Sequence, residues 1–146
     1  MTEQPKKLES ASFAAANEIY RSISFQPSIQ NQDETFGLTK DGRLVALGRI
    51  QRHGEELEIG GFWVEESLRG TGLARRMVVC VLDAIPKGQP AWCVAFTHLA
   101  DFYRSFGMKD HPKDQAPAAI RDKLTYCSEE VERGTYQPVE LLRYEA

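Results

Sequence analysis

The sequence predicts a mixed α/β fold of the α+β type, in which a mostly antiparallel central sheet is flanked by helices. Three strand-like runs, over 35–40, 43–52 and 56–64, follow one another with only tight turns between them, as in an antiparallel meander. After the third run, helical and strand patterns alternate without the regular βαβ repeat of a barrel or a doubly wound sheet. The length of 146 residues, with 42% hydrophobic and 27% charged residues, predicts one globular domain over 1–146.

Turn signals separate the strands of this meander. Asp41-Gly42, between the first two runs, is the strongest two-residue hairpin signal in the chain. His53-Gly54 is a second turn signal before the third run. Gly60-Gly61 lies inside that third run, where glycine often marks a bulge or a close approach of backbone.

Apolar spacing predicts the helices and the remaining strands. Phe13, Ala16, Ile19 and Tyr20 are spaced to share one face of a helix over 8–23. The other expected elements are helices over 72–85, 98–106 and 117–130 and strands over 91–96 and 138–144. Stretches without periodicity predict loops over 24–33 and 110–118.

The stretch Arg69-Gly70-Thr71-Gly72-Leu73-Ala74 follows a predicted strand and opens a predicted helix. Its glycines let backbone N–H groups approach an anion, and the helix N-terminus adds the positive end of its dipole. No Gly-Lys-Ser/Thr follows, and Arg75 and Arg76 stand where the dinucleotide fingerprint needs a glycine. The stretch therefore predicts a phosphate-holding turn for which ATP and NAD are poor ligands.

These residues match an Arg/Gln-x-x-Gly-x-Gly/Ala signature, and on this ground the chain resembles the GNAT acetyltransferase superfamily. Val64, five residues before the arginine, matches the family, and Phe102 to Met108 resembles its aromatic-Tyr-x-x-x-Gly-Phe element with methionine in the last position. The resemblance covers about 36–108 and implies a GNAT-like fold with a splayed strand pair that binds acyl-CoA. Phe96 departs from the pattern, because many relatives carry a cofactor-contacting asparagine there; Thr97 is the candidate substitute.

The resemblance also implies how the cofactor is held. The pyrophosphate of acetyl-CoA would lie in the turn formed by Arg69, Gly70, Thr71, Gly72, Leu73 and Ala74. The pantetheine arm would enter between the strands at 57–64 and 91–96. There the backbone of Phe62, Trp63 and Val64 would pair with its amides, as an added strand pairs with an open edge.

Acetyl transfer to an amine needs a base for the amine and an acid for the departing thiolate. Tyr103 is expected to be the acid, because the resemblance places the family's tyrosine there and a phenol is better matched to a thiolate than a carboxylic acid. Glu58 is expected to be the base, directly or through water, since several relatives carry a base at this position. Glu56, on the same strand face, is second, and His53 and His98 are further candidates. Both carboxylates could instead be solvated.

The cysteines and histidines predict neither a metal site nor a covalent mechanism. Cys80, Cys93 and Cys127 show no CxxC pairing, so no disulfide framework or zinc site is expected. Cys80 and Cys93 lie in apolar patterns and are expected in the core, away from the electropositive setting that a nucleophilic thiol needs. The histidines lack the short spacing of metal ligands.

Charge and hydropathy limit which partners and which cellular location are expected for this protein. A net charge of −3 and a pI near 5.7 argue against a broad nucleic-acid surface. No apolar run approaches the roughly 20 residues of a membrane span, and the first ten residues are polar, so a soluble cytoplasmic protein is expected. The final strand would be an exposed apolar edge without a partner, and together with the dimers common among relatives it favours a homodimer.

Two functions are compatible with this sequence. The first is an acetyl-CoA-dependent N-acetyltransferase acting on a primary amine of a small molecule or peptide by direct attack in a ternary complex. The second is a catalytically silent acyl-CoA-binding or regulatory module, which would need neither Tyr103 nor a strand carboxylate. The sequence does not identify the acceptor, which could be an amino acid such as glutamate, a polyamine, another small amine or a protein N-terminus. It also does not decide whether the acyl group is acetyl or longer.

Overall fold

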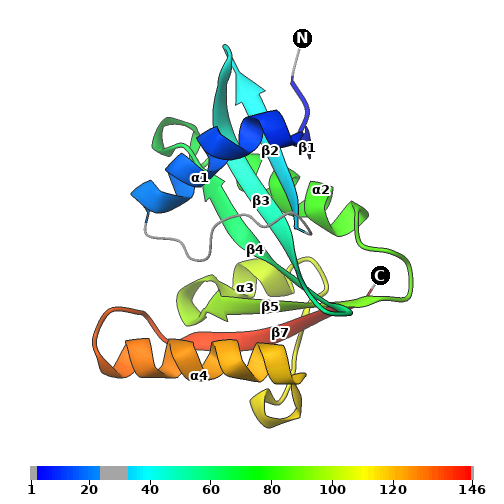
Figure 1. The fold of residues 1–146 in the computed structure, drawn as a ribbon, viewed down its shortest axis with the longest axis vertical. Helices are drawn as coiled ribbons and strands as arrows, with labels where there is room; N and C mark the ends of the chain where they lie inside the picture. Colours follow the sequence, from blue (N-terminus) through cyan, green and yellow to red (C-terminus); the bar gives the residue numbers. More distant parts are fainter. Residues whose placement is uncertain (1–2, 24–32, 146) are drawn as a thin grey trace. The chain divides into compact units, whose positions relative to one another are not determined.

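The computed structural model describes residues 3–23 and 33–145, so the loop expected over 24–33 lies, apart from Asp33, outside the described residues. The strands are β1 (Lys6–Lys7), β2 (Glu34–Lys40), β3 (Arg43–His53), β4 (Glu56–Val64), β5 (Pro90–Phe96), β6 (Lys109–Asp110) and β7 (Val139–Glu145). They form a sheet in the order β1-β2-β3-β4-β5-β7-β6, which Figure 1 shows with its helices. The pairs β1–β2, β2–β3, β5–β7 and β6–β7 are antiparallel and β4–β5 is parallel. The predicted mixed, mostly antiparallel sheet flanked by helices is confirmed.

The helices follow the expected order. They are α1 (Phe13–Ser22), α2 (Leu73–Asp83), α3 (Ala100–Arg104) and α4 (Ala118–Glu132), with 3-10 turns at Ser10–Ser12, Glu66–Leu68, Thr97–Leu99 and Lys113–Gln115. Each of the five expected strands lies within two residues of its predicted bounds, and so do helices α2 and α4. The helices predicted over 8–23 and 98–106 each begin instead with a 3-10 turn. The two-residue strands β1 and β6 were not expected, because they are too short to show an alternating pattern.

The chain divides into two compact units. Unit 1 comprises Met1–Gln51 and Ile59–Ala84, and unit 2 comprises Arg52–Glu58 and Ile85–Ala146. Strands β3 and β4 contribute residues to both units. The expectation of a single domain over 1–146 stays a prediction.

In unit 1, helices α1 and α2 pack against opposite faces of β3. One face carries a buried cluster that includes α1, formed by Leu8, Ala16, Tyr20 and Leu47. Gly48 follows Leu47 and faces the other side. A Cβ on Gly48 would lie 2.7 Å from the Phe62 ring and 3.1 Å from Val81 of α2. This glycine is therefore required by close packing beneath α2.

A bulge changes the side-chain alternation of β3. Leu38 pairs with Ala46 but the next residue, Thr39, pairs with Leu44, so β3 has one extra residue at this point. Simple alternation over this strand would place Arg43 and Arg49 on one face, but the extra residue between them interrupts it. Arg43 is exposed and ion-paired with Glu65, whereas Arg49 is fully buried and ion-paired with Asp33 at 2.8 Å.

In unit 2, α4 packs on one face of β5 and β7. The buried cluster comprises Trp92, Ala116, Ile120, Leu124 and Leu141. The outer edge of β7 is also covered, since β6 pairs with Leu142 and Arg143, the His111 N–H donates to the Leu141 carbonyl, and Lys113 donates to the Val139 carbonyl. The exposed apolar edge that favoured a homodimer is therefore not present in the described part of the chain.

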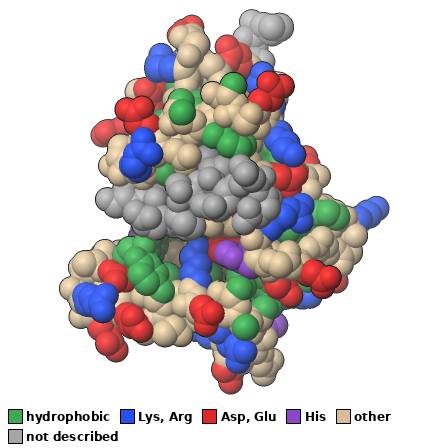
Figure 2. Space-filling view, in the orientation of Figure 1, with side chains coloured by type: hydrophobic (Ala, Val, Ile, Leu, Met, Phe, Trp, Pro, Cys, Tyr) green, Lys and Arg blue, Asp and Glu red, His purple; other side chains and the backbone are tan. Residues whose placement is uncertain are grey.

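The surface carries charges of both signs. On the face drawn in Figure 2, acidic and basic side chains are interspersed, and no large patch of a single sign is seen among the coloured residues. Within residues 3–23 and 33–145, no helix combines the length and apolar character needed to cross a bilayer.

A substitution of Ile120 tests how α4 packs in the core of unit 2. The Ile120 side chain is fully buried in α4, and Ile120→Ala should lower the free energy of unfolding by about 2–5 kcal/mol because it leaves a cavity. Leu99→Ala, at a position 41% exposed, is the matched control and should change it by about 0.5 kcal/mol or less. Chemical denaturation measures both, and equal effects would contradict the packing described for α4.

Candidate active site

The predicted phosphate turn lies in unit 1, between β4 and α2. Gly70 has φ +78° and Gly72 has φ +85°, both in the left-handed region that side chains other than glycine rarely adopt. A Cβ on either residue would meet nothing within 4 Å, so the requirement for glycine here is conformational and not steric. Gly72 is the N-cap of α2 and no side chain caps that end. The first N–H groups of an 11-residue helix therefore point out of an open turn, an arrangement suited to an anion.

Side chains hold this turn in shape. Arg69 Nε donates to the Val64 carbonyl at 3.1 Å, and Thr71 Oγ1 donates to the Leu68 carbonyl. Arg69 is exposed, so the guanidinium both anchors the turn to β4 and adds positive charge at the surface. Arg76, one turn further along α2, donates to the Glu3 carbonyl at 2.7 Å and belongs to the packing of the N-terminal segment.

The strand residues expected to pair with the pantetheine arm have well-defined surroundings in unit 1. Phe62 packs beside Gly48, Trp63 packs on the cluster around Tyr20, and Val64 is buried with its carbonyl bonded to Arg69. Gly61 has φ +62°, and a Cβ there would lie 2.9 Å from Tyr20 and from Arg49, so the close backbone approach expected at Gly60-Gly61 occurs at Gly61. The cofactor role of these three residues stays a prediction.

Glu58 occupies the centre of a charged cluster in unit 2. Its side chain is only 2% exposed. Oε1 lies 2.9 Å from Nε2 of His53, and Oε2 accepts a hydrogen bond from Lys123 Nζ in α4. Because an ionised carboxylate only accepts, the hydrogen in the first contact belongs to Nε2. Glu58 is therefore a buried and paired carboxylate, and the solvated alternative is wrong for it.

The surroundings of Glu58 favour its charged form. Burial opposes ionisation, but the hydrogen bond from His53 and the charge and hydrogen bond of Lys123 outweigh it. The pKa of Glu58 consequently lies below its ordinary value of 4.5. A base of low pKa with both oxygens engaged accepts a proton reluctantly.

Tyr103 is a buried phenol on α3, with 9% of the residue exposed. Burial, with a smaller contribution from Cys93, raises the pKa of Tyr103 well above its ordinary value. The phenol therefore keeps its proton at neutral pH.

The other candidate residues have structural contacts of their own. Glu56 Oε2 accepts from the Trp92 indole at 2.9 Å. His98 is exposed and stacks on Phe96, with ring centroids 5.9 Å apart. Thr97 is exposed, and its N–H donates to the Pro138 carbonyl at 2.8 Å. Among the described residues, His53 is the predicted base candidate whose side chain contacts Glu58 directly.

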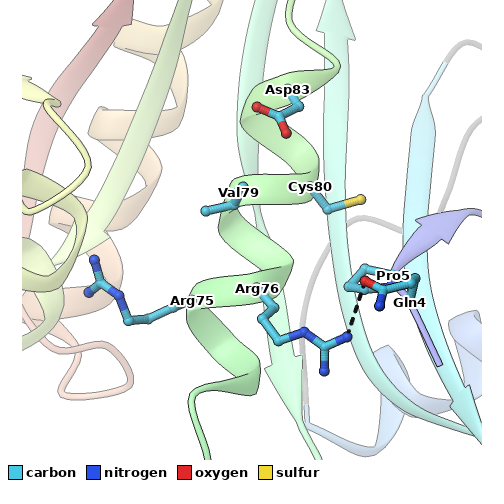
Figure 3. A pocket seen from close by; sticks show the side chains of 7 residues that line it. All are labelled: Gln4, Pro5, Arg75, Arg76, Val79, Cys80 and Asp83. Carbon is cyan, nitrogen blue, oxygen red and sulfur yellow. Dashed lines mark hydrogen bonds between the residues drawn. The ribbon is translucent and has the colours of Figure 1, made fainter. Parts of the chain in front are cut away.

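The cysteines lack the setting of a nucleophile. Cys93 is buried and its pKa is raised to about 12, first by burial; burial also raises the pKa of Cys127. Cys80 is only half-buried, contrary to the core position expected, and lines a pocket of about 440 Å³ with Gln4, Pro5 and residues of α2. Figure 3 shows Arg75 and Arg76 pointing to different sides of α2 beside it. Burial and Asp83 raise the pKa of the Cys80 thiol.

The sequence reasoning missed Lys123 as a site residue. Lys123 is 65 positions from Glu58, and its helix carries several other charged side chains, so nothing local distinguishes it. Its position on the face of α4 that meets β4 is decided by the packing of Ile120 and Leu124, three residues before it and one after. No group of three His, Cys, Asp or Glu side chains that could hold a metal occurs among the residues with a described structure.

The fold and the turn together define a class of protein: an α/β protein with a glycine turn between a strand and a helix whose geometry suits an anion. The model of the acetyltransferase (GNAT) domain family matches residues 3–122, and the chain belongs to this family. The class of enzyme is therefore acyltransferase. No curated protein matches the sequence.

Solved structures share this fold at low sequence identity. Escherichia coli ElaA is 16% identical with a TM-score of 0.70, over 99% of this chain and 100% of that one. The ribosomal-protein-S18-alanine N-acetyltransferase of Escherichia coli is 17% identical with a TM-score of 0.65, over 97% and 91%. N-acetylglutamate synthase from Neisseria gonorrhoeae, complexed with coenzyme A and N-acetyl-glutamate, is 12% identical with a TM-score of 0.66, over 98% of this chain but 35% of that one.

The lowered pKa of Glu58 predicts a pH-dependent stability. Its contribution is fully present above the ordinary pKa of 4.5 and is lost as the pH falls through the lower folded-state value. Glu58→Gln should lower the free energy of unfolding at neutral pH by about 2 kcal/mol, and this difference from the wild type should shrink towards pH 3. Denaturant unfolding at several pH values measures it. Glu129→Gln, at an exposed position of α4, is the control, and a difference that grows on acidification would contradict the assignment.

Proposed function

We propose that this protein is an N-acetyltransferase that moves the acetyl group of acetyl-CoA to a primary amine by direct attack in a ternary complex. The observation that carries the proposal is the uncapped turn before α2, with two left-handed glycines, in a chain that belongs to the GNAT family. The turn supplies backbone N–H groups and a helix dipole, which suit the pyrophosphate of coenzyme A. Its residues would be Arg69, Gly70, Thr71, Gly72, Leu73 and Ala74.

Tyr103 is proposed as the acid that protonates the departing thiolate. Its burial keeps the phenol neutral at physiological pH, so the proton is present when the C–S bond breaks. A neutral donor held in a nearly dry place is of most use to a charge that develops only in the transition state. The base for the acceptor amine is proposed to belong to the cluster of Glu58, because this buried carboxylate is bonded to a partly exposed imidazole.

The acceptor is proposed to be an amine of a small molecule or a peptide. Two proteins of the same fold support this range: one is named for the alanine of ribosomal protein S18 and the other is complexed with N-acetyl-glutamate. Both names are consistent with an acceptor that carries an α-amino group, either of an amino acid or of a peptide terminus.

The first experiment is thermal unfolding with and without acetyl-CoA. At about 100 times the dissociation constant, binding to the native state should stabilise by roughly 2.7 kcal/mol and raise the Tm. Gly72→Val should remove most of this shift, because valine cannot adopt φ +85° without strain. Gly88→Val is the matched control, since Gly88 has φ +83° in open space outside the turn. Loss of the shift in both variants, or no shift in the wild type, would overturn the cofactor assignment.

Tyr103→Phe separates an enzyme from a silent binding module. If the phenol is the acid, turnover should fall by about 10²-fold or more while the Tm shift with acetyl-CoA stays unchanged. CoA release is followed with a thiol reagent over a panel of amino acids, polyamines and short peptides. Wild-type turnover in the variant would remove Tyr103 from the mechanism, and acetyl-CoA binding without turnover of any amine by the wild type would favour the silent module.

A further inference from the structure

The cluster around Glu58 presents its partners, and not the carboxylate, to solvent. The Glu58 side chain is 2% exposed, whereas those of His53 and Lys123 are 30% and 29% exposed. Each Glu58 oxygen is covered by one partner. A substrate amine can therefore reach the imidazole far more readily than the carboxylate behind it.

We propose that His53 is the catalytic residue that takes the proton from the acceptor amine, and that Glu58 and Lys123 are positioning residues that set the orientation and the tautomer of its ring. The proposal rests on the proposed acetyl transfer and assigns the base within it. Glu58 then acts through His53, as the buried aspartate acts through histidine in serine hydrolases.

The hydrogen bonding decides which imidazole nitrogen accepts. Nε2 of His53 faces the acceptor-only Glu58 carboxylate and carries the hydrogen, so Nδ1 holds the lone pair of the neutral ring. Glu58 thus fixes the tautomer as well as the ring orientation. Nδ1 is the atom that would receive a proton from an ammonium group.

The proton balance of the reaction closes with these groups. His53 accepts one proton of the substrate ammonium and passes it to solvent. The nitrogen lone pair then forms the C–N bond as the C–S bond breaks, and the thiolate takes the proton of Tyr103. The second proton lost by the nitrogen restores Tyr103, so one proton is released for each amide formed.

Two opposite charges lie near His53. The Glu58 carboxylate is bonded to its ring, and the Lys123 ammonium is bonded to the other oxygen of that carboxylate. On β5 and α4, Cys93 and Cys127 also interact with Glu58 and Lys123, but burial keeps both thiols neutral. Glu56, on β4, has its carboxylate bonded to Trp92, and Arg52, next to His53 on β3, points to the other face. Lys123 thus holds the carboxylate that orients the imidazole.

The test reads the tautomer of the His53 imidazole by NMR of its ring nitrogens in the full chain. In the wild type the neutral ring should carry its hydrogen on Nε2, which faces Glu58. Glu58→Gln should increase the share of rings with the hydrogen on Nδ1, because the amide no longer requires an N–H donor at Nε2. The controls Lys87→Met and Glu129→Gln change exposed charges elsewhere in unit 2 and should leave the tautomer unchanged. A wild-type ring with its hydrogen on Nδ1 overturns the proposal, even if the protein acetylates amines.

Kinetics supply the second readout. With the amine of highest turnover, His53→Gln should lower kcat by about 10²-fold while leaving the KM for acetyl-CoA and the Tm shift with acetyl-CoA unchanged. Lys123→Met should also lower kcat, and Lys123→Arg, which keeps the cation, should restore it. Retention of wild-type kcat in His53→Gln overturns the role of His53, whereas failure of the proposed function itself would appear separately, as the absence of any Tm shift with acetyl-CoA.

Discussion

The buried charge of Glu58 is the constraint on which the candidate chemistry of unit 2 depends. An ionised carboxylate removed from water is strongly destabilising unless it is paired and hydrogen-bonded. Here the partners come from two other segments, His53 at the end of β3 and Lys123 in the middle of α4. Keeping this charge therefore requires that β3, β4 and α4 hold fixed positions within the unit. A change in any of the three leaves a buried charge without its partner.

The same pairing changes what the carboxylate can do. A free glutamate on a strand would be a candidate base in its own right, whereas a buried, doubly bonded one with a lowered pKa is better suited to holding an imidazole. Tyr103, buried in the same unit, is kept protonated by the same lack of water. Burial disfavours the charged form of both groups, and Glu58 alone stays charged because it alone has a cationic partner.

The glycines of unit 1 show two different constraints that look alike in the sequence. Gly70 and Gly72 have positive φ and open space around them, as a turn that presents N–H groups to an anion requires. Gly48 does not have a positive φ, and there the ring of Phe62 leaves no room for a Cβ. Gly61 combines positive φ with close approach of Tyr20 and Arg49. Only the first kind is suited to a ligand.

The sequence by itself determined the order and type of most elements, the glycine turn before α2 and the family. These depend on residues that are neighbours in the chain, through alternation, helical spacing, hairpin residues and a contiguous motif. It could not determine the extra residue in β3 that separates Arg43 from Arg49, since a bulge leaves no local pattern, or the short strand β6 that covers β7. Nor could it show that Glu58 is buried, that His53 is its partner, or that Lys123 belongs to the same cluster. Those facts follow from which helix face packs on which strand, and this is decided by contacts between residues as many as 65 positions apart in the chain.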